Sequence, residues 1–334
     1  MNYDSLTTDR RTDLLNNLGI YMLSNDIGWQ NAQARAASKN QWFTAEHISL
    51  AINNIATQFL QKDKLQAWMA AYKLPETYKK VGIVMAGNIP LVGFHDFLCG
   101  FMSGHELLLK LSSKDDVLLP WLIDKMAEWE PEVKEQVTVS ERLNDCDAYI
   151  ATGSNNTARY FEQYFGKYPH IIRKNRTSVA VLDGSETSEE LAMLADDVYL
   201  YYGLGCRNVT QVCLPKDYDF AKILTAFNKY NNYSDLNKYK NNYDYHLALY
   251  LLNRVPYMSN ESLLMVENDL PFSAVSVLHY RYYQDKDRLI KELQNSPDIQ
   301  AIIGNGFTPF GTSQQPALSD YADGEDTMAF LCGL

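Results

Sequence analysis

The residue types best suited to chemistry occur together in Gly203-Leu204-Gly205-Cys206-Arg207-Asn208, where a cysteine follows two glycines and precedes a cation. Glycines let a ligand approach the backbone closely, and an adjacent arginine can favour the thiolate, the nucleophilic form of cysteine. Arg207 could equally point away from the sulfur. We predict a reactive thiol at Cys206, and structural or incidental roles for the four cysteines in apolar runs, in an expected turn or near the chain end: Cys99, Cys213, Cys146 and Cys332.

A second polar group follows the apolar run at residues 80–87, which predicts a strand. Asn88 stands between this strand and a helix expected from Leu91. Side chains at the carboxyl ends of strands project into the crevice where α/β sheets bind ligands, so Asn88 could donate a hydrogen bond there. Asparagine also commonly caps helices, and a cap is the alternative interpretation.

Two further strand ends carry groups that could bind a nucleotide. Lys110 and Ser113 follow an expected strand at residues 106–111 and could contact a ribose or a phosphate, although a solvated lysine fits the pattern equally well. Thr152, Gly153 and Ser154 lie between a strand and a helix, where backbone N–H groups can bind a pyrophosphate. Helix capping by Ser154 is the alternative, and the sequence has neither a GxGxxG motif nor a Walker loop.

These groups must be positioned by an α/β scaffold. Apolar residues at three- and four-residue spacing predict helices over residues 1 to about 75, and from Tyr78 short apolar runs alternate with helical stretches, which favours a mostly parallel sheet. Expected strands in this part are 80–87, 106–111, 135–140, 148–153, 170–174 and 178–184, and expected helices are 91–102, 115–129, 156–165 and 188–203.

Beyond Pro215 a second αβ alternation predicts another lobe. Its expected helices are 220–230, 245–255 and 285–295, and its expected strands are 261–266, 273–280 and 299–305. The Asn- and Tyr-rich stretch at residues 228–245 is interpreted as a solvated loop or an irregular helix start.

Composition and charge argue against several classes of function. The 334 residues are 46% hydrophobic with a net charge of −11, which opposes nucleic-acid phosphates and anionic lipid, so no nucleic-acid partner is expected. No apolar run approaches the roughly 18 residues of a membrane helix, and the N-terminus lacks the pattern of a signal peptide, so we expect no membrane insertion and a cytoplasmic location. The scattered cysteines suggest neither disulfides nor a metal site.

The order of these motifs resembles the aldehyde-dehydrogenase superfamily: Asn-x-Pro after a strand, a strand-end lysine with serine, Thr-Gly-Ser before a helix, and Gly-x-x-Cys before a strand. The segment from Phe310 to Met328, FGTSQQPALSDYADGEDTM, is more specifically similar to the end of LuxC-type acyl-CoA reductases. The resemblance covers roughly residues 78 to 334.

The resemblance implies an aldehyde-dehydrogenase-like α/β fold, with a Rossmann-like cofactor domain and a second α/β catalytic domain. The expected parts are a helical region at 1–75 packing on the cofactor domain, an NAD(P)-binding domain at 76–180, a catalytic domain at 181–305 and a segment at 306–334 returning to the domain interface. It also implies an acyl-CoA or acyl-carrier-protein substrate, NADPH or NADH as cofactor, and allows a homodimer.

By the same resemblance, Cys206 matches the catalytic cysteine and Asn88 the asparagine whose amide holds the oxyanion. Lys110 and Ser113 match the contacts to the adenosine side of the cofactor. Ser154, in Thr152-Gly153-Ser154, matches the serine near the pyrophosphate.

Two departures from the superfamily pattern bear on the reaction. Hydrolytic members carry a water-activating glutamate where this chain has Ile172-Arg173-Lys174-Asn175-Arg176-Thr177, which contains no carboxylate. Glu267 and Asp269 fall slightly out of register with the glutamate that contacts the nicotinamide ribose. The resemblance implies an acyl-CoA reductase that reduces an acyl thioester to an aldehyde with NAD(P)H through a cysteine-bound acyl-enzyme. The alternatives are a CoA-acylating or oxidising aldehyde dehydrogenase and a catalytically silent scaffold.

Three tyrosines just before the cysteine allow two interpretations. Tyr199, Tyr201 and Tyr202 could line an acyl tunnel, but their helical spacing is more typical of core residues.

Overall fold

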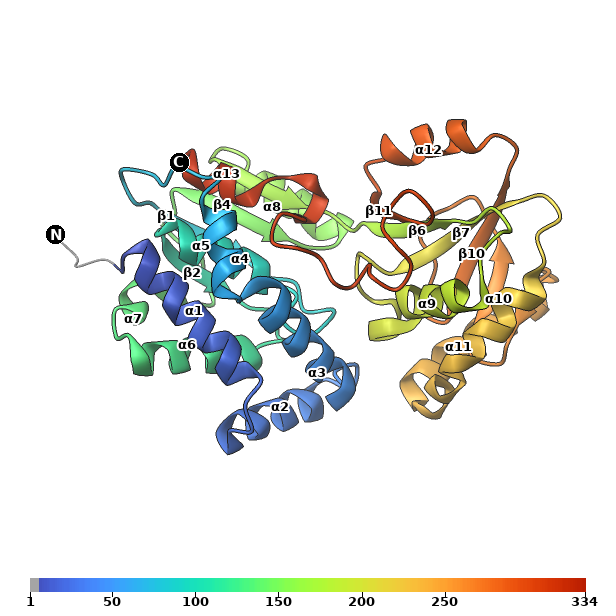
Figure 1. Ribbon diagram of the computed structural model, residues 1–334, viewed down its shortest axis with the longest axis horizontal. Helices are drawn as coiled ribbons and strands as arrows, with labels where there is room; N and C mark the ends of the chain where they lie inside the picture. The colour runs from blue at the N-terminus through green and yellow to red at the C-terminus, as the bar shows by residue number, and fades with distance from the viewer. Residues whose placement is uncertain (1–5) are drawn as a thin grey trace. The chain divides into compact units, whose positions relative to one another are not determined.

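The computed structural model describes residues 6–334, and the chain divides into two compact units (Figure 1). Unit 1 contains the residues up to Asn175 together with Pro316–Leu334, and unit 2 is Arg176–Gln315. The division falls slightly before residue 180, because the strand at Thr177–Val181 pairs within the sheet of unit 2.

Unit 1 begins with helices, as the apolar spacing predicts. Thr7, Asp26 and Thr44 each accept a hydrogen bond from the backbone N–H three residues on, which satisfies a donor at the start of a helix. These elements are α1 (Thr8–Met22), α2 (Ile27–Lys39), α3 (Ala45–Asn54), a π-helical turn (Ile55–Phe59) and α4 (Lys62–Met69).

The sheet of unit 1 is parallel throughout, in the order β3-β2-β1-β4-β5. Its strands are β1 (Lys80–Val84), β2 (Glu106–Lys110), β3 (Val137–Val139), β4 (Ala148–Thr152) and β5 (His170–Arg173). Strand order reverses direction between β1 and β4, where Val84 is in register with Ala151. In doubly wound sheets, ligands bind at the carboxyl ends of the strands beside this switch point.

The remaining helices of unit 1 are α5 (Phe94–Ser103), α6 (Leu118–Trp129), α7 (Val133–Gln136), α8 (Asn155–Phe165) and α13 (Thr327–Cys332), with a 3-10 turn at Ala322–Gly324. Helix α5 is almost wholly buried, and α13 packs beside it (Figure 1). A buried ion pair fixes this region: Arg173 donates to both carboxylate oxygens of Asp96, at 2.7 and 2.6 Å, and to Thr327 Oγ1 at 2.7 Å.

Unit 2 holds a six-stranded sheet in the order β11-β6-β7-β10-β9-β8, parallel except for the β8–β9 pair. Its strands are β6 (Thr177–Val181), β7 (Val209–Pro215), β8 (Met258–Ser259), β9 (Leu264–Glu267), β10 (Val277–Tyr283) and β11 (Ile299–Ile303). Its helices are α9 (Ser188–Tyr199), α10 (Phe220–Phe227), α11 (Asn237–Asn253) and α12 (Lys286–Gln294), with 3-10 turns at Leu200–Gly203 and Asn228–Asp235.

Apolar layers cover both faces of this sheet. Helix α12 lies on one side and α9, α10 and α11 lie on the other (Figure 1). Val179 and Val181 of β6 pack with Leu289 and Leu293 of α12. The expectation of an α/β fold with parallel sheets is therefore confirmed.

Of the two interpretations of residues 228–245, the irregular helix start is confirmed and the solvated loop is wrong. These residues form a 3-10 turn and the first half of α11, and Tyr230, Tyr233 and Tyr239 are buried. A tyrosine ring can pack in a core while its hydroxyl finds a polar partner. Tyr239 does so by donating to Ser262 O at 3.0 Å, and Tyr230 stacks on Tyr199 with ring centroids 4.8 Å apart.

Residues 6–334 contain neither a candidate membrane span nor a candidate metal cluster. No helix there is long and apolar enough to cross a membrane, and no cluster of His, Cys, Asp or Glu side chains is arranged to hold a metal ion.

Candidate active site

Cys206 lies in the turn that joins α9 to β7, and its side chain is half-buried. Helix α9 ends at Tyr199, and the chain then passes through three residues of left-handed backbone: Tyr201 (φ 55°), Tyr202 (φ 57°) and Gly203 (φ 72°). Left-handed backbone is costly for residues other than glycine, so this reversal needs outside support. It redirects the chain from the helix into the turn that presents the thiol.

The turn is tied to the neighbouring strand. Ser178, fully buried on β6, donates from Oγ to the carbonyl oxygen of Cys206 at 3.2 Å. Gly205 is buried, and its N–H donates to Asn208 Oδ1 at 2.8 Å. The sequence identified the glycines and the cysteine of this motif, but Ser178 was not recognised because it is 28 residues away along the chain.

Cys99, Cys146 and Cys213 are buried, whereas Cys206 and Cys332 are half-buried, and none of the five forms a disulfide. Desolvation raises the pKa of Cys146 to about 11 and also raises the pKa of Cys99, Cys213 and Cys332. A raised pKa disfavours the thiolate, which is the reactive form. These four thiols are therefore poorly suited to nucleophilic chemistry, in agreement with the structural roles predicted for them.

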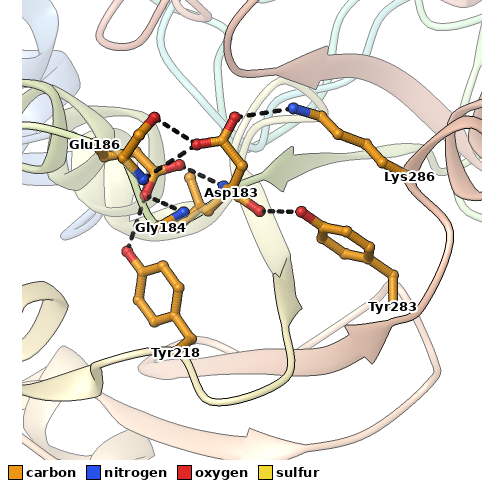
Figure 2. Close-up of polar contacts among 8 residues, drawn as sticks. Asp183, Gly184, Glu186, Tyr218, Tyr283 and Lys286 are labelled. Atoms are coloured by element: carbon orange, nitrogen blue, oxygen red, sulfur yellow. Dashed lines mark hydrogen bonds and ion pairs between the residues drawn. The ribbon is translucent and has the colours of Figure 1, made fainter.

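The start of α9 is held by a cluster of polar contacts (Figure 2). The buried Glu186 carboxylate accepts the backbone N–H groups of Asp183 and Gly184, at 2.6 and 3.1 Å, and the Tyr218 hydroxyl at 3.3 Å. Asp183 accepts from Ser185, whose hydroxyl lies 2.6 Å away, and from Lys286 at 3.0 Å; these two contacts lower its pKa to about 2.

A capping box completes this end of the helix. Thr187 Oγ1 accepts the N–H of Glu190, and the Glu190 carboxylate accepts the N–H of Thr187. Helix α9 therefore has a fixed origin, which limits where its other end, next to the Cys206 turn, can lie.

Asn88 lies in unit 1, in a bend after β1, and is half-buried. Its interpretation as a helix cap is wrong, because the residue at the N-cap of α5 is Gly93. The bend turns sharply at Leu91, which has a φ of 56°. Asp115 holds this turn by accepting the Leu91 N–H at 2.7 Å, and burial raises the pKa of Asp115 to about 7.

The other predicted contacts lie at the same edge of the unit 1 sheet. Lys110 ends β2, and Ser113 follows it; both are exposed. Thr152 ends β4, and Ser154 accepts the Thr157 N–H as the N-cap of α8, so its interpretation as a helix cap is confirmed. Because β2, β1 and β4 are parallel neighbours, their carboxyl ends lie at one edge of the sheet. The residues at this edge are Lys110, Thr152, Gly153, Ser154 and the bend that contains Asn88. Cys206 belongs to unit 2.

Two stretches depart from the aldehyde-dehydrogenase sequence pattern, at residues 172–177 and 267–269, and the structure describes both. Ile172 is a half-buried residue of β5. Glu267 is exposed at the end of β9, and the loop that contains Asp269 is held by Gln211, which donates to Asn268 O at 2.9 Å and to Leu270 O at 3.2 Å.

The three tyrosines before the cysteine are buried, with exposed fractions of 1, 4 and 6% for Tyr199, Tyr201 and Tyr202. Tyr199 stacks with Tyr230 and shares a hydrogen bond with Ser262, and Tyr202 packs against Tyr233. These contacts are those of core residues.

The architecture is that of an aldehyde-dehydrogenase-like protein. Solved structures of aldehyde dehydrogenases match most of the chain in fold. An oxidoreductase from Marinobacter aquaeolei matches with a TM-score of 0.67, 9% identity, and 93% of this chain and 76% of that one. The Mycobacterium tuberculosis aldehyde dehydrogenase complexed with NAD⁺ matches with a TM-score of 0.61, 15% identity, and coverages of 85% and 70%.

The family follows from the sequence match. Residues 17–223 match the family model described as acyl-CoA reductase (LuxC), and this range contains Cys206, Asn88 and every other predicted site residue. The chain belongs to this LuxC family. It is also similar to the long-chain acyl-protein thioester reductase of Aliivibrio fischeri, at 26% identity over 146 residues, which are 39% of this chain and only 30% of that relative.

Proposed function

We propose that the protein reduces an acyl thioester to an aldehyde with NADPH or NADH, through an acyl group held on Cys206. The observation that carries the proposal is the Cys206 turn: a half-buried thiol between α9 and β7, anchored by Ser178, inside the segment that matches the LuxC family. Burial raises the pKa of the other four thiols, which disfavours their thiolates and supports the choice of Cys206 made from its turn.

In the proposed reaction, the Cys206 thiolate attacks the carbonyl carbon of an acyl-CoA or an acyl-carrier protein. A new carbon–sulfur bond forms to Cys206, the carrier thiolate leaves and takes up a proton, and an enzyme thioester remains. The Asn88 amide and the backbone N–H of Cys206 would donate hydrogen bonds to the oxyanion formed during attack. A bound nicotinamide would supply the hydride that reduces this thioester to the aldehyde level. The bond from the carbonyl carbon to Cys206 Sγ would then break, which releases the aldehyde and restores the Cys206 thiolate.

The edge of the unit 1 sheet has groups that suit a nicotinamide dinucleotide. Backbone N–H groups at the start of α8 can bind a pyrophosphate, with Thr152, Gly153 and Ser154 at that position. Lys110 and Ser113 are exposed beside the switch point and could contact the adenosine side. A cation and hydroxyl groups match the anionic and polar surface of this ligand.

The lack of a carboxylate in residues 172–177 favours reduction over hydrolysis. This stretch corresponds to the segment that carries the water-activating glutamate in hydrolytic aldehyde dehydrogenases, so no carboxylate in it would prepare a water to attack the enzyme thioester. The acyl group could then persist until hydride reaches it. The same cysteine could also serve the reverse, CoA-acylating reaction.

The test is a two-stage labelling experiment. Purified protein is incubated with radiolabelled acyl-CoA of several chain lengths without reductant, then digested and mapped, with Cys206→Ala as the matched control. The expected result is label on the peptide that contains Cys206. When NADPH or NADH is added to the labelled protein, the label should leave as aldehyde, and the reductant that releases it identifies the cofactor.

Other outcomes redirect the assignment. Label released only as free acid would contradict reduction, and label retained by Cys206→Ala would remove this cysteine from the reaction. Aldehyde oxidation with NAD⁺ and CoA, without measurable thioester reduction, would favour the CoA-acylating alternative. No acyl transfer from either carrier would favour a silent scaffold.

A further inference from the structure

The end of α9 and the turn that carries Cys206 meet at one buried side chain. Asn208 is fully buried, and both ends of its amide bind backbone atoms. Oδ1 accepts the Gly205 N–H at 2.8 Å, and Nδ2 donates to Asp197 O at 3.0 Å and to Leu200 O at 2.8 Å, with Val198 O at 3.4 Å. One amide therefore joins the residue before Cys206 to the last carbonyl groups of the helix.

These carbonyl groups need such a partner. The last four C=O groups of an α-helix receive no hydrogen bond from within the helix. Here the left-handed residues Tyr201 and Tyr202 follow, so the chain cannot continue the helix and supply the missing N–H donors. Left-handed non-glycine residues persist only where surrounding contacts hold them. The hydrogen bond from Nδ2 to Leu200 O lies at the start of this left-handed segment, and the Gly205 contact lies at its end.

The Asn208 backbone adds a third connection. Its N–H donates to Gly205 O at 3.1 Å, and its carbonyl oxygen accepts the Ser178 N–H at 3.0 Å. Ser178 in turn donates from Oγ to Cys206 O. The Cys206 peptide is thus held on one side by β6 and on the other by the Asn208 amide.

We propose that Asn208 is a positioning residue for Cys206, which fixes the turn so that the thiol meets an acyl carbonyl in a reactive geometry. The expected effect on acylation rests on the proposed function, whereas the hydrogen bonds of Asn208 do not. The amide is suited to the role because it both donates and accepts; aspartate would keep an acceptor for Gly205 but lose the donors to the helix end, and alanine would lose both.

The experiment compares the wild-type chain with Asn208→Ala, Asn208→Asp and a control, Asn260→Ala. Asn260 is also buried in unit 2 and also binds backbone, accepting the Leu263 N–H at 2.9 Å. Its Nδ2 donates to the Tyr199 hydroxyl at 3.2 Å, and its hydrogen bonds go to Tyr199, Ser262 and Leu263 rather than to residues 203–208. Three quantities are measured: hydrogen exchange of the peptide containing Gly205, the rate at which labelled acyl-CoA acylates Cys206, and the rate at which iodoacetamide alkylates each cysteine.

In Asn208→Ala we expect exchange at Gly205 to accelerate on the order of tenfold, since one hydrogen bond is lost. Acylation of Cys206 should fall roughly 100-fold, because small displacements of a reacting group are costly. Iodoacetamide needs little orientation, so alkylation of Cys206 should change by less than about fivefold, while the buried Cys99 and Cys213 stay protected and report an intact fold. Asn208→Asp should slow acylation while protecting Gly205 more than alanine does.

The results that would overturn the inference are distinct from those that would overturn the proposed function. Unchanged exchange at Gly205 in Asn208→Ala, or equal loss of acylation in Asn260→Ala, would remove the positioning role. If Asn208→Ala exposes Cys99 and Cys213, Asn208→Asp becomes the deciding variant. If the wild-type chain accepts no acyl group, the proposed function fails, and the exchange measurement alone decides whether Asn208 holds the turn.

Discussion

Asn88 and Asp115 are linked through one backbone turn, although they are 27 residues apart. The Asp115 carboxyl accepts the Leu91 N–H, and Leu91 has left-handed backbone three residues after Asn88. Gly87, just before Asn88, also depends on close packing, because a Cβ there would lie 2.6 Å from the Ser112 side chain. The position of the Asn88 amide is therefore set by neighbours on the loop after β2.

The role proposed for Asn88 predicts a kinetic defect. In Asn88→Ala we expect the acylation rate of Cys206 to fall on the order of 10²- to 10³-fold, because one donor to the oxyanion is lost. Single-turnover labelling measures this rate, and circular dichroism checks the fold. Asn53→Ala, at an exposed position on α3, is the control and should acylate normally. An Asn88→Ala variant with near-normal acylation would exclude this residue from the mechanism.

Asp115 predicts a pH-dependent stability. Its pKa of about 7 lies above the ordinary value near 3.8, so between these pH values the unfolded chain has released the proton that the folded chain retains. Stability attributable to this group therefore falls as pH rises from 4 to 7, by at most roughly 1.4 kcal/mol per pH unit.

Asp115→Asn keeps an oxygen that can accept the Leu91 N–H but does not titrate. Urea unfolding between pH 4.5 and 7.5 should show the variant gaining stability relative to wild type as pH rises. A constant difference across this range would mean that Asp115 ionises normally in the folded chain.

Helix α9 is the element that connects structural support to the cysteine. The capping box and the Glu186 cluster, which Figure 2 shows, hold its start. The Asn208 amide holds its end. The Asp197 carboxylate adds a further anchor near the end, accepting the N–H groups of Gly311 at 2.7 Å and Ser313 at 3.0 Å. Because α9 packs on the sheet between these fixed points, a change at its start is predicted to act mainly on stability.

Glu186→Gln tests the cluster at the start of α9. An amide has one acceptor oxygen where the carboxylate has two, so the N–H of Asp183 or of Gly184 loses its charged partner, and we expect a loss of about 1–3 kcal/mol in the free energy of unfolding. The exposed Glu189→Gln, in the first turn of the same helix, should cost only a few tenths of a kcal/mol at moderate salt. Equal effects in denaturant titrations would show that the buried contacts contribute little.

At the scale of the molecule, the chain leaves unit 1 after Asn175 and returns to it at Pro316. The returning segment completes the core of unit 1, since Met328 and Leu331 are fully buried. Tyr321 accepts the Trp68 indole N–H at 2.8 Å, and His105 shares a hydrogen bond with Leu331 O at 2.9 Å. Unit 1 therefore needs both ends of the described chain to form its core.

Leu331→Ala tests this dependence. Removing a buried leucine side chain leaves a cavity, and we expect a loss of about 2–5 kcal/mol. All five tryptophans lie in unit 1, at positions 29, 42, 68, 121 and 129, so tryptophan fluorescence during urea unfolding reports on that unit. Leu23→Ala, at a side chain of unit 1 that is 50% exposed, is the control and should shift the transition much less. A wild-type midpoint in Leu331→Ala would show that the last helix is dispensable to the core.

Local patterns in the sequence were sufficient for much of this molecule. Apolar periodicity predicted the helices and the parallel strands, because the same spacing that buries one face of an element also defines its type. The glycines beside Cys206 and the polar groups after β1, β2 and β4 were recognisable for a similar reason, since strand ends of a parallel sheet share one edge.

Contacts between distant residues were decided only by the tertiary structure. Ser178 reaches Cys206 from a neighbouring strand, Asp115 reaches Leu91 from the next loop, and Tyr230 becomes a core residue by stacking on Tyr199. The Asn208 amide was visible in the motif, but its partners at the end of α9 were not. A sequence determines local conformation through short-range spacing, whereas the partner of a buried polar group depends on which segments pack together in three dimensions.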